Sequence, residues 1–427
     1  MKNFNLKKYQ EPKSPKNKKY KVCFYSNSPN IATGYAKVIR EICSRLANDP
    51  SFEVHVIGEN YIGPPQQFQN YTMWGMDQKI IKHDRQETFF PAFLQAFSQI
   101  KPDVIIILED TFTLAHQGWY DWSLRYGKPC PLILYLPLDG KWTPTNGLPI
   151  LRMVDKIVSM AKFTQWAAKE DGFASDVIYH GVDLFKFKPV TLDQKMALRR
   201  KYGFPEDCFL LFNYGRNNMR KSNPQLCKLI AEYLKDKDPK KFKAFLHIMN
   251  YTAPDGNLID LWNRVIEKET GINFLDTGHV FMNPKAVDYG TAPSDDEIAE
   301  YIQMSDLIVS ATTGEGFGLI MAEAAACQIP VIHPDYSTPY ELLVEEVNGI
   351  GPRGIAVPYT TKYVSSFNTE HAFVDIPKAV EAIDYLQKNP QVREEMGKNG
   401  RKFVEAMCNW DYIVEQWKKA IRDVCDE

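Results

Sequence analysis

The chain has 427 residues, which is enough for two domains of ordinary size, each with its own hydrophobic core. Hydrophobic residues make up 44% and charged residues 24%, and the formal net charge of -2 excludes a global attraction to nucleic acid or to membranes. No apolar run approaches the roughly 20 residues that span a bilayer, and no signal-peptide core is present, so we expect a cytoplasmic protein.

The first half of the chain predicts strands that alternate with helices. Residues 1–19 are rich in lysine and are expected to form a flexible basic tail. The first strand is Tyr20–Ser26, and an amphipathic helix follows Thr33-Gly34. Further strands are expected at 53–58, 103–108, 132–136 and 156–160. This alternation predicts a doubly wound parallel sheet, in which ligands bind beyond the carboxyl ends of the strands.

Two groups of carboxylates follow strands of this first sheet. Glu109 and Asp110 come after the strand at 103–108, and Asp139 comes after the strand at 132–136. All three are candidates to contact a substrate hydroxyl. For Glu109 and Asp110 we favour a role as helix or turn caps. Asp139 precedes Gly140, and Asp-Gly is itself a strong turn dipeptide, so both interpretations of Asp139 stay open.

The second half begins with a helix expected at 192–202 and a strand at 209–213. Arg216 follows this strand, and Lys221 precedes a helix that starts at Asn223-Pro224, where proline suits the first turn. Two cations at this spacing could converge on one anion, such as a diphosphate. The alternative is an exposed basic loop. Further strands are predicted at 244–249 and 272–275, and helices at 258–267 and 294–304, the last with the capping-box pair Ser294 and Glu297.

A strand at 307–310, the loop Gly314–Gly318 and an alanine-rich helix then form an arrangement that suits phosphate binding. Glycines let the backbone approach an anion, and the N–H groups and dipole of the helix point at it. Glu323 lies in this apolar helix and needs a hydrogen-bonding partner, for which sugar or ribose hydroxyls would serve. Many turns of this kind bind no ligand, so the loop alone is ambiguous.

The whole stretch is more specific than the loop. Glu315 and Glu323 flank seven residues, and Pro330–Ile332 and Glu341 continue the pattern. This stretch resembles the donor-site signature of the family-4 retaining glycosyltransferases of GT-B fold. The spacing of Arg216 and Lys221 is also similar to that family, as are the His180–Asp183 domain junction and the final helix, so the resemblance covers residues 20–425. Departures from the family pattern are Gln328 and Asn250-Tyr251 in place of glycines, and Asp139 in a loop that commonly holds histidine.

The resemblance implies an α/β GT-B architecture, in which two Rossmann-like domains with doubly wound parallel sheets face a central cleft. The expected parts are an acceptor-side domain at 20–188, a nucleotide-sugar donor domain at 189–405, and a helix at 406–427 that packs back on the first domain. The implied activity moves a sugar from a nucleotide-sugar donor to an acceptor hydroxyl, with retention of anomeric configuration and without metal.

The resemblance also assigns site residues. Arg216 and Lys221 would clamp the donor diphosphate, Glu315 would bind the donor-sugar hydroxyls, and Glu323 would bind the ribose. Asp139 would substitute for the family histidine as a catalytic candidate. The remaining residues expected at the donor are Gly34, Gly316, Phe317 and Gly318.

A metal cofactor is not expected. The pair Asp236 and Asp238 lies among lysines at a helix end, which is typical of a solvated turn rather than a metal site. The eight cysteines lie mostly in apolar patterns that predict buried free thiols. Two rival functions remain, a sugar-nucleotide epimerase of the same architecture and a non-catalytic protein that binds sugar nucleotides or glycans. The acceptor could be a glycan, a lipid-linked sugar, a protein or a modified nucleobase.

Overall fold

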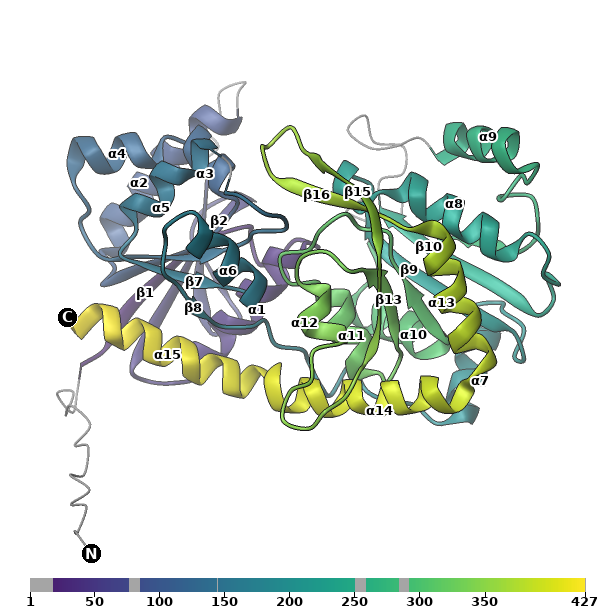
Figure 1. The fold of residues 1–427 in the computed structure, drawn as a ribbon. Helices are drawn as coiled ribbons and strands as arrows, with labels where there is room; N and C mark the ends of the chain where they lie inside the picture. The colour runs from purple at the N-terminus through teal and green to yellow at the C-terminus, as the bar shows by residue number, and fades with distance from the viewer. Residues whose placement is uncertain (1–17, 77–84, 144, 250–258, 284–291, 427) are drawn as a thin grey trace, which may run out of the picture.

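The computed structural model describes residues 18–76, 85–143, 145–249, 259–283 and 292–426. Two α/β domains lie side by side, each built on a parallel sheet flanked by helices (Figure 1). The expected tail therefore falls almost wholly outside the described residues, as do Asn250 and Tyr251. The predicted fold class, two parallel-sheet α/β domains, is confirmed.

The first sheet has eight strands in the order β3-β4-β2-β1-β5-β6-β7-β8, and all neighbours are parallel except β3 and β4. Its strands are β1 (Tyr20–Ser26), β2 (Phe52–Ile62), β3 (Gln66–Phe68), β4 (Tyr71–Met76), β5 (Val104–Leu108), β6 (Leu132–Leu136), β7 (Lys156–Ser159) and β8 (Asp176–Val177). All residues of β5 and β6 are buried. Continuous apolar strands of this kind are typical of a parallel sheet that helices cover on both faces.

The helices of this first domain are α1 (Gly34–Leu46), α2 (Arg85–Ile100), α3 (Thr111–His116), α4 (Trp119–Tyr126), α5 (Leu148–Met153) and α6 (Lys162–Glu170), with the 3-10 helix η2 (Thr145–Gly147). α1 begins after Thr33, whose Oγ1 accepts a hydrogen bond from the Ala36 N–H at 3.2 Å. This cap satisfies one of the N–H groups that a helix start leaves without a backbone partner.

The second sheet has six parallel strands in the order β11-β10-β9-β12-β13-β14. They are β9 (Phe209–Arg216), β10 (Phe242–Met249), β11 (Val280–Met282), β12 (Leu307–Val309), β13 (Val331–Pro334) and β14 (Gly354–Val357). Its helices are α7 (Leu192–Lys201), α8 (Asn223–Leu234), α9 (Ile259–Thr270), α10 (Asp295–Met304), α11 (Leu319–Ala326), α12 (Pro339–Leu343), α13 (Ile376–Lys388) and α14 (Pro390–Met407), with the 3-10 helix η3 (Met219–Lys221). The predicted capping box at Ser294 and Glu297 is confirmed at the start of α10.

The predicted strand at 272–275 is wrong, because these residues form turns and the edge strand is β11. Phe274 is buried and packs with the core around α8 and α9. The Asn273 side chain accepts hydrogen bonds from Asn263 at 2.7 Å and from the Asp276 N–H at 3.3 Å. A short apolar run can bury itself against helices as well as in a sheet, and periodicity does not separate the two cases.

An antiparallel hairpin that the sequence did not suggest extends from the second domain toward α3 (Figure 1). It consists of β15 (Tyr359–Val364) and β16 (Glu370–Val374). The Glu370 N–H donates to the Lys141 carbonyl of the first domain at 2.9 Å. The hairpin therefore joins the two domains through a backbone contact.

The last helix, α15 (Trp410–Asp426), packs on the first domain, against α1 and β5. Its Trp417 is fully buried, with its ring 4.8 Å from that of Tyr135 on β6. At the domain junction, a Cβ added to Gly181 would lie 2.3 Å from the Trp410 ring, so only glycine permits this close approach.

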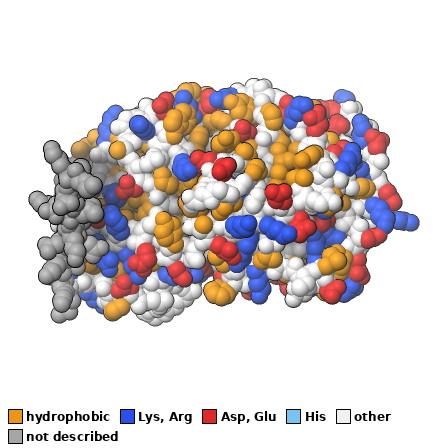
Figure 2. Space-filling model, turned by 60° about the horizontal axis from the view of Figure 1, so that its bottom comes forward, with side chains coloured by type: hydrophobic (Ala, Val, Ile, Leu, Met, Phe, Trp, Pro, Cys, Tyr) orange, Lys and Arg blue, Asp and Glu red, His pale blue; other side chains and the backbone are white. Residues whose placement is uncertain are grey.

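Two further observations concern the apolar length of the helices and the distribution of charge on the surface. Within the described part of the chain, no helix is long and apolar enough to cross a membrane. On the face shown in Figure 2, basic and acidic side chains are interspersed, as the small net charge predicts.

Candidate active site

Two helix N-termini from different domains face each other. Gly34 is the first residue of α1, and Leu319 is the first residue of α11. A Cβ added to Gly34 would lie 3.6 Å from Leu319 Cδ1, which places the two helix starts in contact. Each start presents N–H groups and the positive end of a helix dipole, so an anion between the domains would meet both.

The glycine loop that follows β12 lies against the first domain. A Cβ added to Gly314 would lie 2.0 Å from the Asp139 carbonyl oxygen, and one added to Gly316 would lie 3.1 Å from Met160 Sδ. Gly318 has a φ of 89° and caps the start of α11, a conformation that favours glycine. The glycines thus allow the loop both its turn and its close contact with the other domain.

Phe317 does not present its side chain to this loop surface. The side chain is 2% exposed, and its ring lies 5.8 Å from that of Tyr179 and 4.7 Å from that of His180. Phe317, one of the five residues of the loop Gly314–Gly318, therefore anchors the loop in the core at the domain junction.

Glu315 is held by two cations of the turn η3. Its side chain is nearly buried, with Oε1 2.5 Å from Lys221 Nζ and Oε2 2.9 Å from Arg220 Nη1. The structure thus brings together Lys221 and Glu315, which the sequence analysis expects at the donor. Arg216, by contrast, lies exposed at the end of β9, and the arginine that contacts Glu315 is Arg220.

Arg220 also reaches the first domain. Its Nε lies 2.7 Å from Asp139 Oδ2, and its Nη1 donates to the Gly314 carbonyl at 2.5 Å. The short turn explains why neighbouring residues converge, since Asn218 caps η3 by accepting from the Lys221 N–H at 3.0 Å. Arg220 lies beside Lys221 in the sequence, whereas the spacing of the family resemblance selected Arg216.

The electrostatics of this cluster are balanced. Burial by itself would raise the pKa of Glu315, but Lys221 and Arg220 hold that pKa well below its ordinary value. Burial lowers the pKa of Lys221, and Glu315 opposes that shift. With Asp139 the cluster has two carboxylates and two cations. A diphosphate would therefore compete with carboxylates for cations that are already in place.

Glu323 has the polar partner that its burial predicts, and the partner comes from the other domain. Glu323 is 4% exposed and forms an ion pair with Lys37 of α1. Lys37 Nζ also lies 3.0 Å from Asp295 Oδ1 at the start of α10, and Arg40 Nη2 lies 3.2 Å from Asp295 Oδ2. Burial raises the pKa of Glu323, and Lys37 opposes that shift. Sequence reasoning missed Lys37, because its role depends on α1 lying against α11.

Asp110 and Glu109 lie beside this boundary. Asp110 occupies the N-cap position of α3, as the capping interpretation predicts, but its side chain makes no cap hydrogen bond. Instead its Oδ1 accepts from the Tyr35 hydroxyl at 3.0 Å. Burial and the nearby Asp139 raise the pKa of Asp110 to about 7, and burial with Glu59 raises that of Glu109. Its surroundings therefore disfavour the ionised form of Asp110.

Asp139 is more than a turn residue, because two side chains of the second domain face it. Besides Arg220, His371 of β16 lies with Nε2 3.8 Å from Asp139 Oδ1. His371 is buried, and its Nδ1 lies 3.2 Å from Thr313 Oγ1. Sequence reasoning missed His371, since the hairpin that carries it was not predicted.

The pair Asp236 and Asp238 lies beyond the end of α8, and α8 starts at the carboxyl edge of the sheet and runs back along it. Both residues are exposed, and Asp238 Oδ1 accepts from the Lys240 N–H at 2.9 Å, as in a solvated turn. Within the described ranges, no group of three or more potential ligands is placed to hold a metal ion.

Comparison with known proteins gives a match to a family model and matches to several relatives. Residues 282–403 match the family model described as "Glycosyl transferases group 1". EpsD from Bacillus subtilis (strain 168), which carries a glycosyltransferase name, is 25% identical over 270 residues. That match covers 63% of this chain and 59% of EpsD, so the chain spans less than two thirds of this relative.

Solved structures extend the likeness of fold over nearly the whole chain. Sucrose-phosphate synthase from Thermosynechococcus elongatus has a TM-score of 0.73 at 17% identity, covering 95% of this chain and 99% of that one. HepE from Anabaena, solved in complex with UDP-glucose, has a TM-score of 0.67 at 15% identity, covering 95% and 100%. Over 282–403 the sequence is similar to group 1 glycosyltransferases, and over nearly its whole length the chain shares its two-domain GT-B fold with these two solved structures.

Proposed function

We propose that this protein is a glycosyltransferase that moves a sugar from a nucleotide-sugar donor to an acceptor hydroxyl. The observation that carries the proposal is the cluster of Lys221 and Arg220 at Glu315, beside the facing starts of α1 and α11. A diphosphate leaving group develops negative charge as the glycosidic bond breaks, and cations with helix N-termini stabilise that charge. The complex of HepE with UDP-glucose makes UDP-sugars the first donor class to test.

Each donor contact has a candidate residue. Lys221 and Arg220, together with Arg216, would bind the diphosphate, Glu315 the hydroxyls of the donor sugar, and Glu323 the ribose. Because Lys37 already pairs with Glu323, the ribose would enter by sharing or displacing that cation. Losing a hydrogen bond to a charged group costs about 1.5–3 kcal/mol. Glu323→Ala should therefore weaken binding of the free nucleotide. Glu315→Ala should weaken chiefly binding of the intact nucleotide sugar.

We further propose a metal-independent, front-face reaction with retention, as in family 4. The two cations and helix N-termini supply positive charge at the diphosphate, and a diphosphate oxygen would take the acceptor proton on the face that the nucleotide leaves. Asp139 Oδ2 lies 2.7 Å from Arg220 Nε. Because this ion pair reduces the nucleophilicity of the carboxylate, it disfavours Asp139 as a covalent nucleophile. NMR of the product measures the anomeric configuration, and an inverted linkage would reject this route.

The test of the overall proposal is incubation of the full chain with a panel of nucleotide sugars and acceptors, followed by mass spectrometry. We expect nucleotide release and a glycosylated product that requires acceptor. Lys221→Ala should abolish both, and Lys235→Ala, which removes an exposed lysine at the end of α8, is the matched control. Turnover to an epimer without acceptor would instead indicate an epimerase. Nucleotide-sugar binding without turnover would indicate a binding protein.

A further inference from the structure

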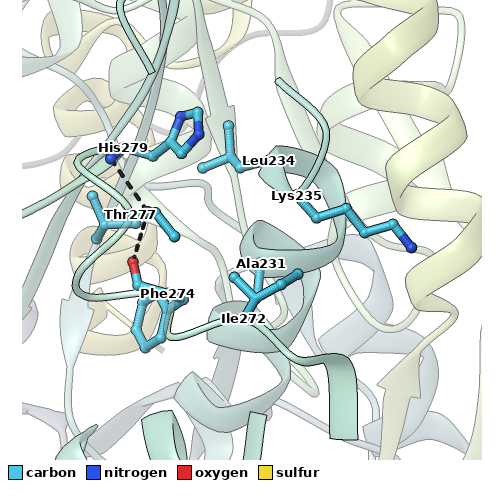
Figure 3. A pocket seen from close by; sticks show the side chains of 8 residues that line it. Ala231, Leu234, Lys235, Ile272, Phe274, Thr277 and His279 are labelled. Atoms are coloured by element: carbon cyan, nitrogen blue, oxygen red, sulfur yellow. Dashed lines mark hydrogen bonds between the residues drawn. The ribbon is translucent and has the colours of Figure 1, made fainter. Parts of the chain in front are cut away.

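Two cavities among the described residues differ greatly in size. One, of about 30 Å³, lies between the end of α8 and the segment 272–280 (Figure 3). Thr277 Oγ1 there donates to the Phe274 carbonyl at 3.1 Å and accepts from the His279 N–H at 3.3 Å. That volume has room for only a few water molecules, so this cavity suits no larger organic ligand.

The other cavity, of about 500 Å³, lies between the two domains at the tip of the β15–β16 hairpin. We call it the hairpin hollow. Ligand pockets in proteins typically measure about 300–1,000 Å³, so its size suits a small organic molecule. Its lining includes Phe112 and His116 of α3, Thr145 and Asn146 of η2, and Phe367 and Asn368 of the hairpin turn.

The lining of the hairpin hollow limits the chemistry of its occupant. Among the described residues, the lining holds aromatic rings, amides, hydroxyls and one histidine, and no lysine, arginine or carboxylate. An anionic ligand would lack a cation, and a wholly apolar ligand would bury amides without partners. The side-chain amides of Asn146 and Asn368 donate to no other group in the described part of the chain. Carbohydrates offer both hydroxyls for amides and C–H faces for aromatic rings.

The aromatic wall of the hollow joins the two domains. Phe112 of α3 and Phe367 of the hairpin turn are stacked, with ring centroids 4.3 Å apart and an interplanar angle of 18°. Phe367 is nevertheless 51% exposed, so its ring keeps surface free for a ligand. An exposed ring held in place by stacking is pre-organised, which reduces the entropy cost of binding.

Both walls of the hollow are formed by residues that lie close in the sequence to residues of the proposed site. On the first domain, Phe112 lies in the first turn of α3, two residues after Asp110 at the N-cap. On the hairpin, His371 faces Asp139, and Asn368 lies three residues before it. At about 3.3 Å per residue, the hollow lies roughly 10 Å from the Asp139 cluster. An acceptor whose reacting hydroxyl lies at the Asp139 cluster would therefore have to be extended to reach the hairpin hollow.

We propose that the hairpin hollow is an acceptor subsite, and that it binds an uncharged sugar unit of an extended acceptor whose reacting hydroxyl lies by Asp110 and Asp139. This proposal rests on the proposed function for the reacting end, but the hollow can be tested without turnover. Phe367 would stack on the sugar ring, and Asn146 and Asn368 would bind its hydroxyls. The hairpin would thus select acceptors by length.

The test measures binding of neutral mono-, di- and trisaccharides to the full chain, with UDP present, by saturation-transfer NMR and calorimetry. We expect at least one di- or trisaccharide to bind tenfold or more tightly than its monosaccharide units. Phe367→Ala should remove that difference and leave UDP affinity unchanged. The matched control is Phe185→Ala, which removes a ring that is 92% exposed at the domain junction. This variant should keep the tenfold preference for the oligosaccharide.

The outcomes separate the two proposals. Equal binding of mono- and oligosaccharides, no binding at all, or an unchanged preference in Phe367→Ala would overturn the subsite. If the protein still transferred or hydrolysed a nucleotide sugar, the proposed function would stand without the subsite. If oligosaccharides bound through Phe367 but no nucleotide sugar bound, the proposed function would fail and the hollow would be a glycan site. Asn146→Ala, an exposed residue of η2, provides a second variant if Phe367→Ala misfolds.

Discussion

Replacing Lys37 with methionine is expected to lower the free energy of unfolding by about 3–5 kcal/mol, the cost of removing one partner of a buried ion pair. Lys37 Nζ bridges Glu323 and Asp295, and its Nζ lies 4.5 Å from the centroid of the Phe187 ring. Methionine keeps most of the apolar stem, so the substitution removes chiefly the charge. Asp295 retains Arg40, which leaves Glu323 as the buried carboxylate without a cation.

The assay is equilibrium unfolding in urea at pH 5 and pH 8. Burial already raises the pKa of Glu323 above its unfolded value, and removing Lys37 raises it further. The loss of stability should therefore be full at pH 8 and shrink as pH falls through the folded pKa, because protonated Glu323 needs no cation. Adding Glu323→Gln to Lys37→Met should restore most of the stability at pH 8.

The control for this experiment is Lys228→Met, which removes an exposed ion pair with Glu269 and should cost about 0–1 kcal/mol. Two results would refute the reasoning about Lys37. One is a Lys37→Met protein as stable as the unsubstituted chain at pH 8. The other is an equal loss at both pH values that Glu323→Gln does not reverse.

Three further predictions concern the same boundary. Arg220→Ala should weaken nucleoside diphosphate binding by about 2–5 kcal/mol, and more than Arg216→Ala does, in calorimetric titrations; a larger loss in Arg216→Ala would reverse the assignment. Burial and Asp139 raise the pKa of Asp110 to about 7, so its ionised form is costly in the folded protein. Asp110→Asn should therefore raise thermal stability by up to about 4 kcal/mol at pH 8 and leave it unchanged at pH 4. Equal effects at both pH values would contradict this. Gly314→Ala places a methyl group 2.0 Å from the Asp139 carbonyl and should cost about 1–3 kcal/mol or more in urea unfolding, whereas Gly351→Ala, with 3.5 Å to its nearest neighbour, should not.

Much of the fold could be predicted from short stretches of sequence. The apolar runs that became β5 and β6, the capping box of α10 and the glycine loop before α11 are each specified by a few consecutive residues. A continuous apolar run, a cap pair at fixed spacing and a group of glycines are all visible in the sequence without knowledge of distant contacts. The hairpin β15–β16 and the turns at 272–275 were not predicted, because their apolar residues pack against distant elements rather than with a local period.

The sequence by itself determined which side chains are available for a site: Lys221, Glu315 and Glu323, with Asp139 as a candidate. The tertiary structure alone decided which charges meet. Lys37 and Glu323 are 286 residues apart, and Arg220 and Glu315 are 95 apart, so no local pattern records either contact. Ion-pair energies fall with distance and depend on burial. Both quantities are set by how α1, η3 and the hairpin pack against the loop before α11, which is a property of the folded domains together.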